Sequence, residues 1–155
     1  MKSILNKWYF IAGCLFLTLL GGGIYYAYQA AHSSAQGVEV DWRLLGEMDY
    51  ITGKSSDELS HLNHKKVKIP GFMVPLEDNM KETTEFLLVP TPQACIHVPP
   101  PPPNQMVYVK MKDGKGTEVP AGPIWVYGEL NLVTKKSMYG DANFELIGDL
   151  VEPYK

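Results

Sequence analysis

The hydrophobic pattern divides the chain near residue 37 into two unequal parts. Residues 8–28 (WYFIAGCLFLTLLGGGIYYAY) contain no charged residue, and Lys2 and Lys7 precede them. A helix of this length, at about 1.5 Å per residue, can cross a hydrocarbon core of about 30 Å. Aromatic residues stand at both ends, where amphipathic rings collect at membrane interfaces. Because the lysines lie only before the segment, the positive-inside rule predicts a cytoplasmic N-terminus and a C-terminal domain outside the cytoplasm.

Three fates of this segment fit the pattern. An uncleaved signal-anchor is favoured, because the segment is long and has aromatic residues at both ends. A signal peptide cleaved after Ala35 satisfies the small-residue rule through Ser33 and Ala35, and a lipoprotein would be modified at Cys14, which follows Ile11-Ala12-Gly13. All three predict the same organisation: a signal or anchor segment over 1–28, a small polar linker over 29–37, and a folded domain over 38–155.

The polar and apolar residues of the folded domain predict two short helices followed by strands. Asp41 can cap a helix over 41–45, and the sequence of 55–59 can begin another, with Leu59 and Leu62 at helical spacing. From Lys65 onward the apolar residues recur with a period of two, which is typical of strands. Strands are predicted at 67–76, 85–89, 106–111, 123–133 and 142–151. The pair Pro70-Gly71 predicts a bulge or an edge kink in the first of them.

These elements predict a mainly β fold: a small five-stranded OB-like barrel or sandwich, preceded by one N-terminal hydrophobic helix and the short helices. Gly128 and Gly148 fall in the middle of two predicted strands. Closing a small barrel requires sharply coiled strands, and glycine permits that coiling. A small open sandwich is the alternative.

Composition and charge narrow the classes of function. The 155 residues carry a formal net charge of -3 and no Lys/Arg-rich stripe, so nucleic acid is not an expected partner. Two cysteines, one of them inside the apolar segment, exclude a disulfide scaffold. The chain has no Cys-x-x-Cys pair, no Gly-rich phosphate loop and no Ser elbow, so we do not expect an enzyme.

Candidate chemistry is concentrated in residues 90–105 (PTPQACIHVPPPPPNQ). Cys95 and His97 are two residues apart, which places both side chains on one face of an extended segment. A thiolate and an imidazole are ligands for zinc or for a softer ion such as Cu(I). Zinc requires at least one further ligand, and Glu77 is the candidate that we include with them. The alternatives are Asp78 or the pair His61 and His64 for zinc, and Met73, Met80 and Met106 for Cu(I). Burial of Cys95 as a small apolar side chain is the alternative.

Five consecutive prolines follow this pair. Prolines lock φ, so residues 99–103 predict a polyproline II rod of about 15 Å that donates no backbone hydrogen bond. Such a rod can present a rigid surface to a protein partner. The predicted partner-binding residues are Pro99, Pro100, Pro101, Pro102, Pro103, Asn104 and Gln105.

Two blocks of the sequence resemble a known family. They are GFMVPLE at 71–77, followed by EFLLVP, and ACIHVPPPPPNQ at 94–105. Both resemble a bacterial envelope family of domains of unknown function, found in membrane-anchored proteins and lipoproteins. Its members tend to be encoded beside ABC-type export or uptake machinery, some of it linked to zinc acquisition.

The resemblance implies a periplasmic accessory protein of a transport system, held in the bacterial inner membrane by a single pass through residues 8–28. It implies zinc as the cofactor at Cys95, His97 and Glu77, and an ABC-type transporter subunit as the partner. The alternative is a metal-free interaction module that docks on the transporter through its proline segment.

Overall fold

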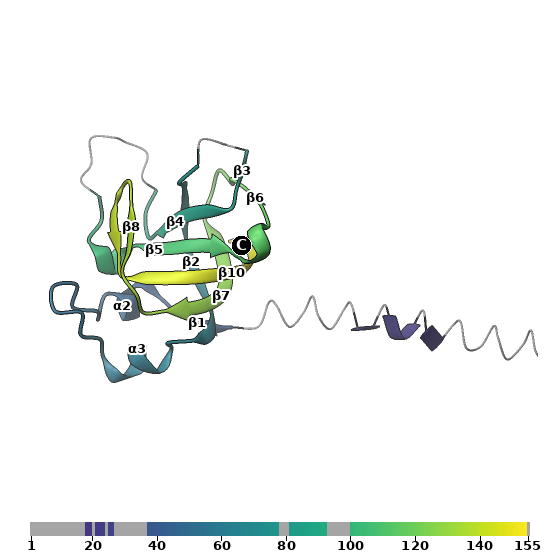
Figure 1. Cartoon of the computed structure of the whole chain (residues 1–155), viewed down its shortest axis with the longest axis horizontal. Helices are drawn as coiled ribbons and strands as arrows, with labels where there is room; N and C mark the ends of the chain where they lie inside the picture. Colours follow the sequence, from purple (N-terminus) through teal and green to yellow (C-terminus); the bar gives the residue numbers. More distant parts are fainter. Residues whose placement is uncertain are drawn as a thin grey trace, which may run out of the picture. The chain divides into compact units, whose positions relative to one another are not determined.

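The computed structural model describes residues 18–19, 21–23, 25–26, 37–77, 81–92 and 100–154. The chain divides into two units, Met1–Ala35 and Gln36–Lys155, and the fold below is that of the second unit (Figure 1). Most of the predicted membrane segment, the predicted cleavage site and Cys14 lie outside the described residues. Within the described part of the chain, no helix is both long enough and apolar enough to span a membrane.

The second unit is mainly β, with a few short helices. Its elements, in chain order, are β1 (Val38–Glu39), α2 (Trp42–Leu45), α3 (Asp57–His61), β2 (Lys65–Pro75), β3 (Glu82–Thr83), β4 (Glu85–Val89), η1 (Pro103–Gln105), β5 (Val107–Met111), η2 (Lys112–Gly114), β6 (Thr117–Glu118), β7 (Ile124–Asn131), β8 (Lys135–Ser137), β9 (Gly140–Ala142) and β10 (Phe144–Pro153).

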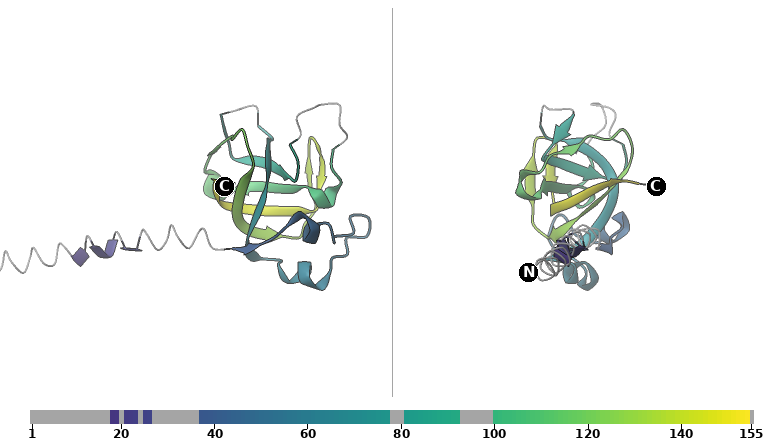
Figure 2. Two further views of the ribbon diagram at one scale, coloured as in Figure 1. Left: turned by 180° about the vertical axis from the view of Figure 1, so that it is seen from behind. Right: turned by 90° about the vertical axis from the view of Figure 1, so that its right-hand side faces the viewer.

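Five of these strands close into a barrel. They pair in the order β2-β4-β5-β10-β7, and β7 pairs again with β2. All these pairs are antiparallel except β5 with β10, which is parallel. Figure 2 shows the strands curving around a common interior. Of the two predicted architectures, the structure therefore has the closed barrel and not the open sandwich.

Strand β2 closes the barrel by changing its partner midway. Residues from Lys65 to Gly71 pair with β7, and those from Phe72 to Pro75 pair with β4. The change falls at Gly71, where a Cβ would lie 2.7 Å from the carbonyl oxygen of Val89. The predicted bulge or edge kink at Pro70-Gly71 was wrong, because β2 runs unbroken through this pair and Gly71 is the corner of the barrel. The carbonyl oxygen of Pro70 accepts a hydrogen bond from the Trp42 indole at 2.6 Å.

The two mid-strand glycines are direct partners in the sheet. Gly128 of β7 stands opposite Gly148 of β10. A Cβ on Gly128 would overlap the backbone carbonyl of Ile147, so the two backbones approach more closely than any side chain allows. Immediately after Gly148 the register of β10 shifts by a β-bulge before Leu150. The predicted role of these glycines in coiling the barrel strands agrees with this pairing.

The barrel interior holds the main hydrophobic core. Alternate residues of each strand point inward, as the period of two predicts. The core side chains that are fully shielded from solvent include Val67, Ile69, Phe86, Leu88, Val107, Val109, Val126, Leu130, Phe144 and Leu146.

The two short helices cover one end of the barrel, and both begin where the sequence predicts. The Asp41 carboxylate accepts the Leu44 amide at 2.8 Å and caps α2, and the Ser56 hydroxyl caps α3 by accepting the Leu59 amide. Leu45 and Leu59 are completely buried in the core. Because each helix has only four or five residues, this burial and the caps stabilise them more than helix propensity does.

Gly128→Ala should destabilise the barrel by about 1–3 kcal/mol, because the new methyl group forces β7 away from β10. Urea unfolding of the full chain, followed by tryptophan fluorescence, measures the change. Gly122→Ala is the matched control, since nothing lies within 4 Å of a Cβ there, and it should stay within about 0.5 kcal/mol of the parent. Equal stability of the two variants would contradict the close approach.

Candidate functional site

A second apolar cluster lies on the outside of the barrel, over β2, β4 and β5. Leu87 and Val89 of β4 alternate with the core residues Phe86 and Leu88, and so point outward. Both outward side chains are nevertheless buried. Their cluster also contains Met106, Ala142, Phe72, Val74, Leu76 and Tyr108. We call this cluster and its polar border the outer face.

A carboxylate, a phenol and an ammonium group border the outer face at one end of β4. Glu85 of β4 stands directly opposite Lys110 of β5. The Glu85 carboxylate accepts a hydrogen bond from the Tyr108 hydroxyl at 2.5 Å and binds the Lys110 ammonium at 2.8 Å. Both oxygens of one carboxylate are thus bonded, and the Glu85 side chain is fixed on the surface of the sheet.

The adjacent strand β10 extends this polar border. Glu145 is the sheet partner of Tyr108 and forms an ion pair with Lys135 of β8 at 2.7 Å. This pair ties the β8–β9 hairpin to the barrel wall. Each of the two ion pairs joins one carboxylate to one ammonium group, so positive and negative charges alternate along the border.

The environment of this border shifts three pKa values. Burial, together with the hydrogen bond to Glu85, raises the pKa of Tyr108 to about 12. The hydrogen bonds from Lys110 and Tyr108 lower the pKa of Glu85, and the carboxylate of Glu85 raises the pKa of Lys110. Glu85 is therefore a carboxylate and Tyr108 a neutral donor at neutral pH. None of the three is poised to transfer a proton near pH 7.

Glu77, the predicted third metal ligand, lies in the loop between β2 and β4. Its carboxylate accepts hydrogen bonds from the backbone amide of Thr84, at 3.1 Å, and from the Thr84 hydroxyl. These bonds lower the pKa of Glu77. The side chain is thus held beside the first residue of β4, where it closes the loop.

Cys95, His97 and Pro99 lie outside the described residues. Of the three predicted metal ligands, only Glu77 lies in the described part of the chain. Among residues 37–77, 81–92 and 100–154, no group of three His, Cys, Asp or Glu side chains could hold a metal ion.

The end of the proline segment is fixed to the rest of the domain by four hydrogen bonds. The Asn104 amide donates to the carbonyl oxygens of Gly46 at 3.2 Å and Met48 at 2.9 Å, and the Gln105 amide donates to that of Trp42 at 3.1 Å. From the other side, the backbone amide of Asn143 donates to the carbonyl of Pro103 at 2.9 Å. Helix η1 is therefore held between the α2 segment and the β8–β9 hairpin.

These contacts change the roles expected of the predicted partner-binding residues. The amide donors of Asn104 and Gln105 are engaged within the domain, and Asn104 is buried. Pro100 and Pro102, in contrast, are exposed. The backbone of Pro102, with φ -62° and ψ 155°, has polyproline II geometry. The two amides act as anchors, and the exposed prolines are the surface that they hold.

Sequence reasoning did not single out Glu85, Tyr108 or Lys110. The available signal was weak: each is a polar position in an otherwise apolar strand, at the outward phase of the alternation. That phase is equally typical of a solvated sheet surface. Only the register of β4 against β5 brings the three groups together.

The fold and its outer face define a small closed-barrel β domain with a loop-framed surface. The chain belongs to the DUF3299 family, whose members are proteins of unknown function, and the family model matches residues 46–153. The predicted membership in a family of unknown function is thereby confirmed.

A crystal structure of a DUF3299 family protein from Pseudomonas aeruginosa PAO1 is similar to this chain. The two chains are 30% identical and superpose with a TM-score of 0.59, over 77% of this chain and 97% of the other. No curated protein matches the chain.

Tyr108 should ionise at a higher pH than the other tyrosines in an alkaline titration. We expect a transition near pH 12, measured by absorbance at 295 nm, that Tyr108→Phe removes and Tyr50→Phe does not. Glu85→Gln should lower the pKa of Tyr108, because it removes the negative charge that opposes ionisation. Since the pKa is raised on folding from 10.0, Tyr108 stabilises the fold below pH 10, and this contribution is lost as the pH rises through about 12. An unchanged transition in Glu85→Gln would contradict the hydrogen bond.

Proposed function

We propose that this protein is a membrane-anchored, periplasmic accessory factor of an ABC-type transport system, and that it is a binding module and not an enzyme. Residues 8–28 would hold it in the inner membrane. The rigidly mounted proline segment would dock on a transporter subunit.

The strand order supports a binding role. Counted along the chain, the barrel strands pair in the order 1-2-3-5-4-1, which is the order of the OB fold. OB folds bind their ligands on the face of the second and third strands, framed by the adjoining loops. In this chain these strands are β4 and β5, and their outward surface is the outer face described above. The first sequence block of the family resemblance, at 71–77, lies in the end of β2 and the residues that follow it, next to β4.

The observation that carries the proposal is the anchoring of the proline segment by Asn104 and Gln105. A polyproline II segment is stiff before it binds, so it loses little conformational entropy when a partner covers it. The anchors at its end add to this by fixing its direction relative to the barrel. Aromatic-lined grooves on other proteins recognise such segments.

Replacing the exposed prolines should weaken docking. We expect Pro100→Ala with Pro102→Ala to lower recovery of the transporter subunit about tenfold, which corresponds to a loss of about 1.4 kcal/mol. The measurement is chemical crosslinking in envelope membranes with the full-length chain, followed by quantification of the crosslinked ABC-type subunit. Pro92→Ala, an exposed proline of the same loop outside the run, is the matched control. Recovery that does not depend on the proline substitutions would refute this docking mode.

Metal binding is the second candidate function, with zinc as the favoured ion. It is favoured by the two-residue spacing of Cys95 and His97 and by the anchoring of the same loop at η1. A loop held at both ends by strand β4 and helix η1 would order its ligands at a lower entropic cost than a free loop.

Zinc content separates this second candidate from the first. We expect about one zinc ion per full-length chain purified under reducing conditions, and its loss in Cys95→Ala and in His97→Ala, measured by elemental mass spectrometry. Glu77→Gln tests the third ligand: a carboxylate ligand requires loss of zinc, whereas a residue that only closes its loop on Thr84 leaves the content unchanged. Zinc no higher in the parent than in the Cys95→Ala, His97→Ala double variant would exclude the site.

A further inference from the structure

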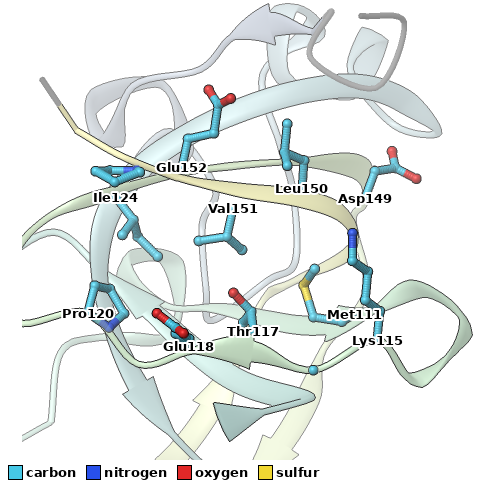
Figure 3. A pocket seen from close by; sticks show the side chains of 12 residues that line it. Met111, Lys115, Thr117, Glu118, Pro120, Ile124, Asp149, Leu150, Val151 and Glu152 are labelled. Atoms are coloured by element: carbon cyan, nitrogen blue, oxygen red, sulfur yellow. The ribbon is translucent and has the colours of Figure 1, made fainter. Parts of the chain in front are cut away.

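A cavity of about 350 Å³ lies on a different part of the barrel from the outer face. It opens between the second half of β10 and the chain that leads from β5 through β6 toward β7. Figure 3 shows Val151 of β10 pointing into it, with Met111 and Thr117 across from Val151 and with Ile124 and Pro120 at one side. Its volume falls within the range of about 300–1,000 Å³ that is usual for ligand sites.

The cavity lies where the pairing of β5 with β10 ends. The pairing of β5 with β10 ends at Met111 and Gly148, and β10 then continues to Pro153 with β7 as its partner. On the side that β5 has left, the backbone of Leu150 to Glu152 borders the cavity. The result is a short strand edge directly beside an apolar cavity.

Such an edge selects the kind of ligand. Backbone amide and carbonyl groups along a strand edge are matched in spacing by another extended chain, as in recognition by β-strand addition. The walls formed by Val151, Ile124 and Met111 suit one apolar side chain of that segment. Because Pro153 has no amide hydrogen and ends the edge, the matching segment is short.

Charge around the cavity further restricts the ligand. Glu118 lies across the cavity from Val151, whereas Glu152 points to the opposite side of β10 in Figure 3 and shares a side-chain hydrogen bond with Tyr127. Neither carboxylate forms an ion pair with a residue that the structure describes, whereas Asp149 is bound by Lys66. Lys115 is the one cation among the described lining residues, so carboxylates outnumber ammonium groups around the cavity. Basic side chains of a ligand complement this rim.

We propose that this cavity and the edge of β10 bind an extended peptide segment of another protein, through one apolar residue flanked by lysine or arginine. The peptide adds to the free edge at Leu150 to Glu152, its apolar side chain enters the cavity against Val151, and its basic side chains meet Glu118 and Glu152. This site shares no residue with the outer face and does not depend on the proposed docking of the proline segment.

Selection from a phage-displayed library of random linear peptides tests the site, with the full-length chain in detergent as bait. We expect enriched peptides to share an apolar residue with lysine or arginine beside it. Thr117→Phe, which fills the cavity, should weaken a synthetic copy of an enriched peptide at least about tenfold by fluorescence anisotropy. An unchanged melting temperature verifies that this variant is folded.

Two further measurements separate the edge from the rim. Methylating alternate backbone nitrogens of the peptide should weaken binding by a similar factor, because it removes donors to the edge of β10. Glu118→Gln with Glu152→Gln should weaken binding and reduce its salt dependence, whereas Glu58→Gln, an exposed carboxylate on α3, should change neither.

Failure to enrich any peptide over the Thr117→Phe variant would overturn the proposal, as would equal binding to parent and variant. Peptides that lose affinity in Lys110→Ala but not in Thr117→Phe would assign binding to the outer face and also refute the cavity. The Pro100→Ala, Pro102→Ala variant should bind these peptides normally. Failure of the cavity and failure of the proline docking are therefore distinguishable.

Discussion

The whole domain depends on one strand, β2, which must pair with β7 at its start and with β4 at its end. A five-stranded sheet closes only if one strand bends enough to serve both neighbours. Gly71 permits the change of partner, because any Cβ there would press on the carbonyl of Val89. The facing glycines Gly128 and Gly148 permit the matching close approach of β7 and β10. Side chains at these three positions would push the paired strands apart and so destabilise the closed barrel. Closure matters because an open sheet exposes two strand edges, which are a liability for aggregation.

Closure of the barrel decides what is left for binding. The interior is filled by packed side chains, so ligands must bind outside or at a gap in the wall. Two such places exist in the described part of the chain: the outer face of β4 and β5, with its fixed Glu85–Tyr108–Lys110 border, and the cavity beside β10. Both places follow from strand pairing. The register of β4 against β5 brings together the groups of the outer face, and the cavity lies where the pairing of β5 with β10 ends.

Side-chain hydrogen bonds and one ion pair tie segments that flank the strands to the rest of the domain. Glu77 closes the first loop on Thr84, Asn104 and Gln105 tie the proline segment to the α2 segment, and Lys135 ties the hairpin to Glu145. Glu77, Asn104 and Gln105, which the sequence suggested as binding residues, thus anchor the segments that carry them. For the docking that we propose, this anchoring is an advantage, because a surface whose ends are fixed in advance loses less conformational entropy on association.

The sequence by itself determined the class of fold, the approximate strands, the starts of both helices and the Asp41 cap of the first, because alternation and capping are local properties. It also located Gly128 and Gly148 in the middle of their strands, and the candidate metal ligands and prolines in residues 90–105. Tertiary structure alone decided that Gly128 faces Gly148, that Pro70-Gly71 is a corner and not a bulge, and that Glu77 bonds to Thr84. Register, loop anchoring and the cavity depend on residues far apart in the chain, and a pattern read along one strand carries no information about its neighbour.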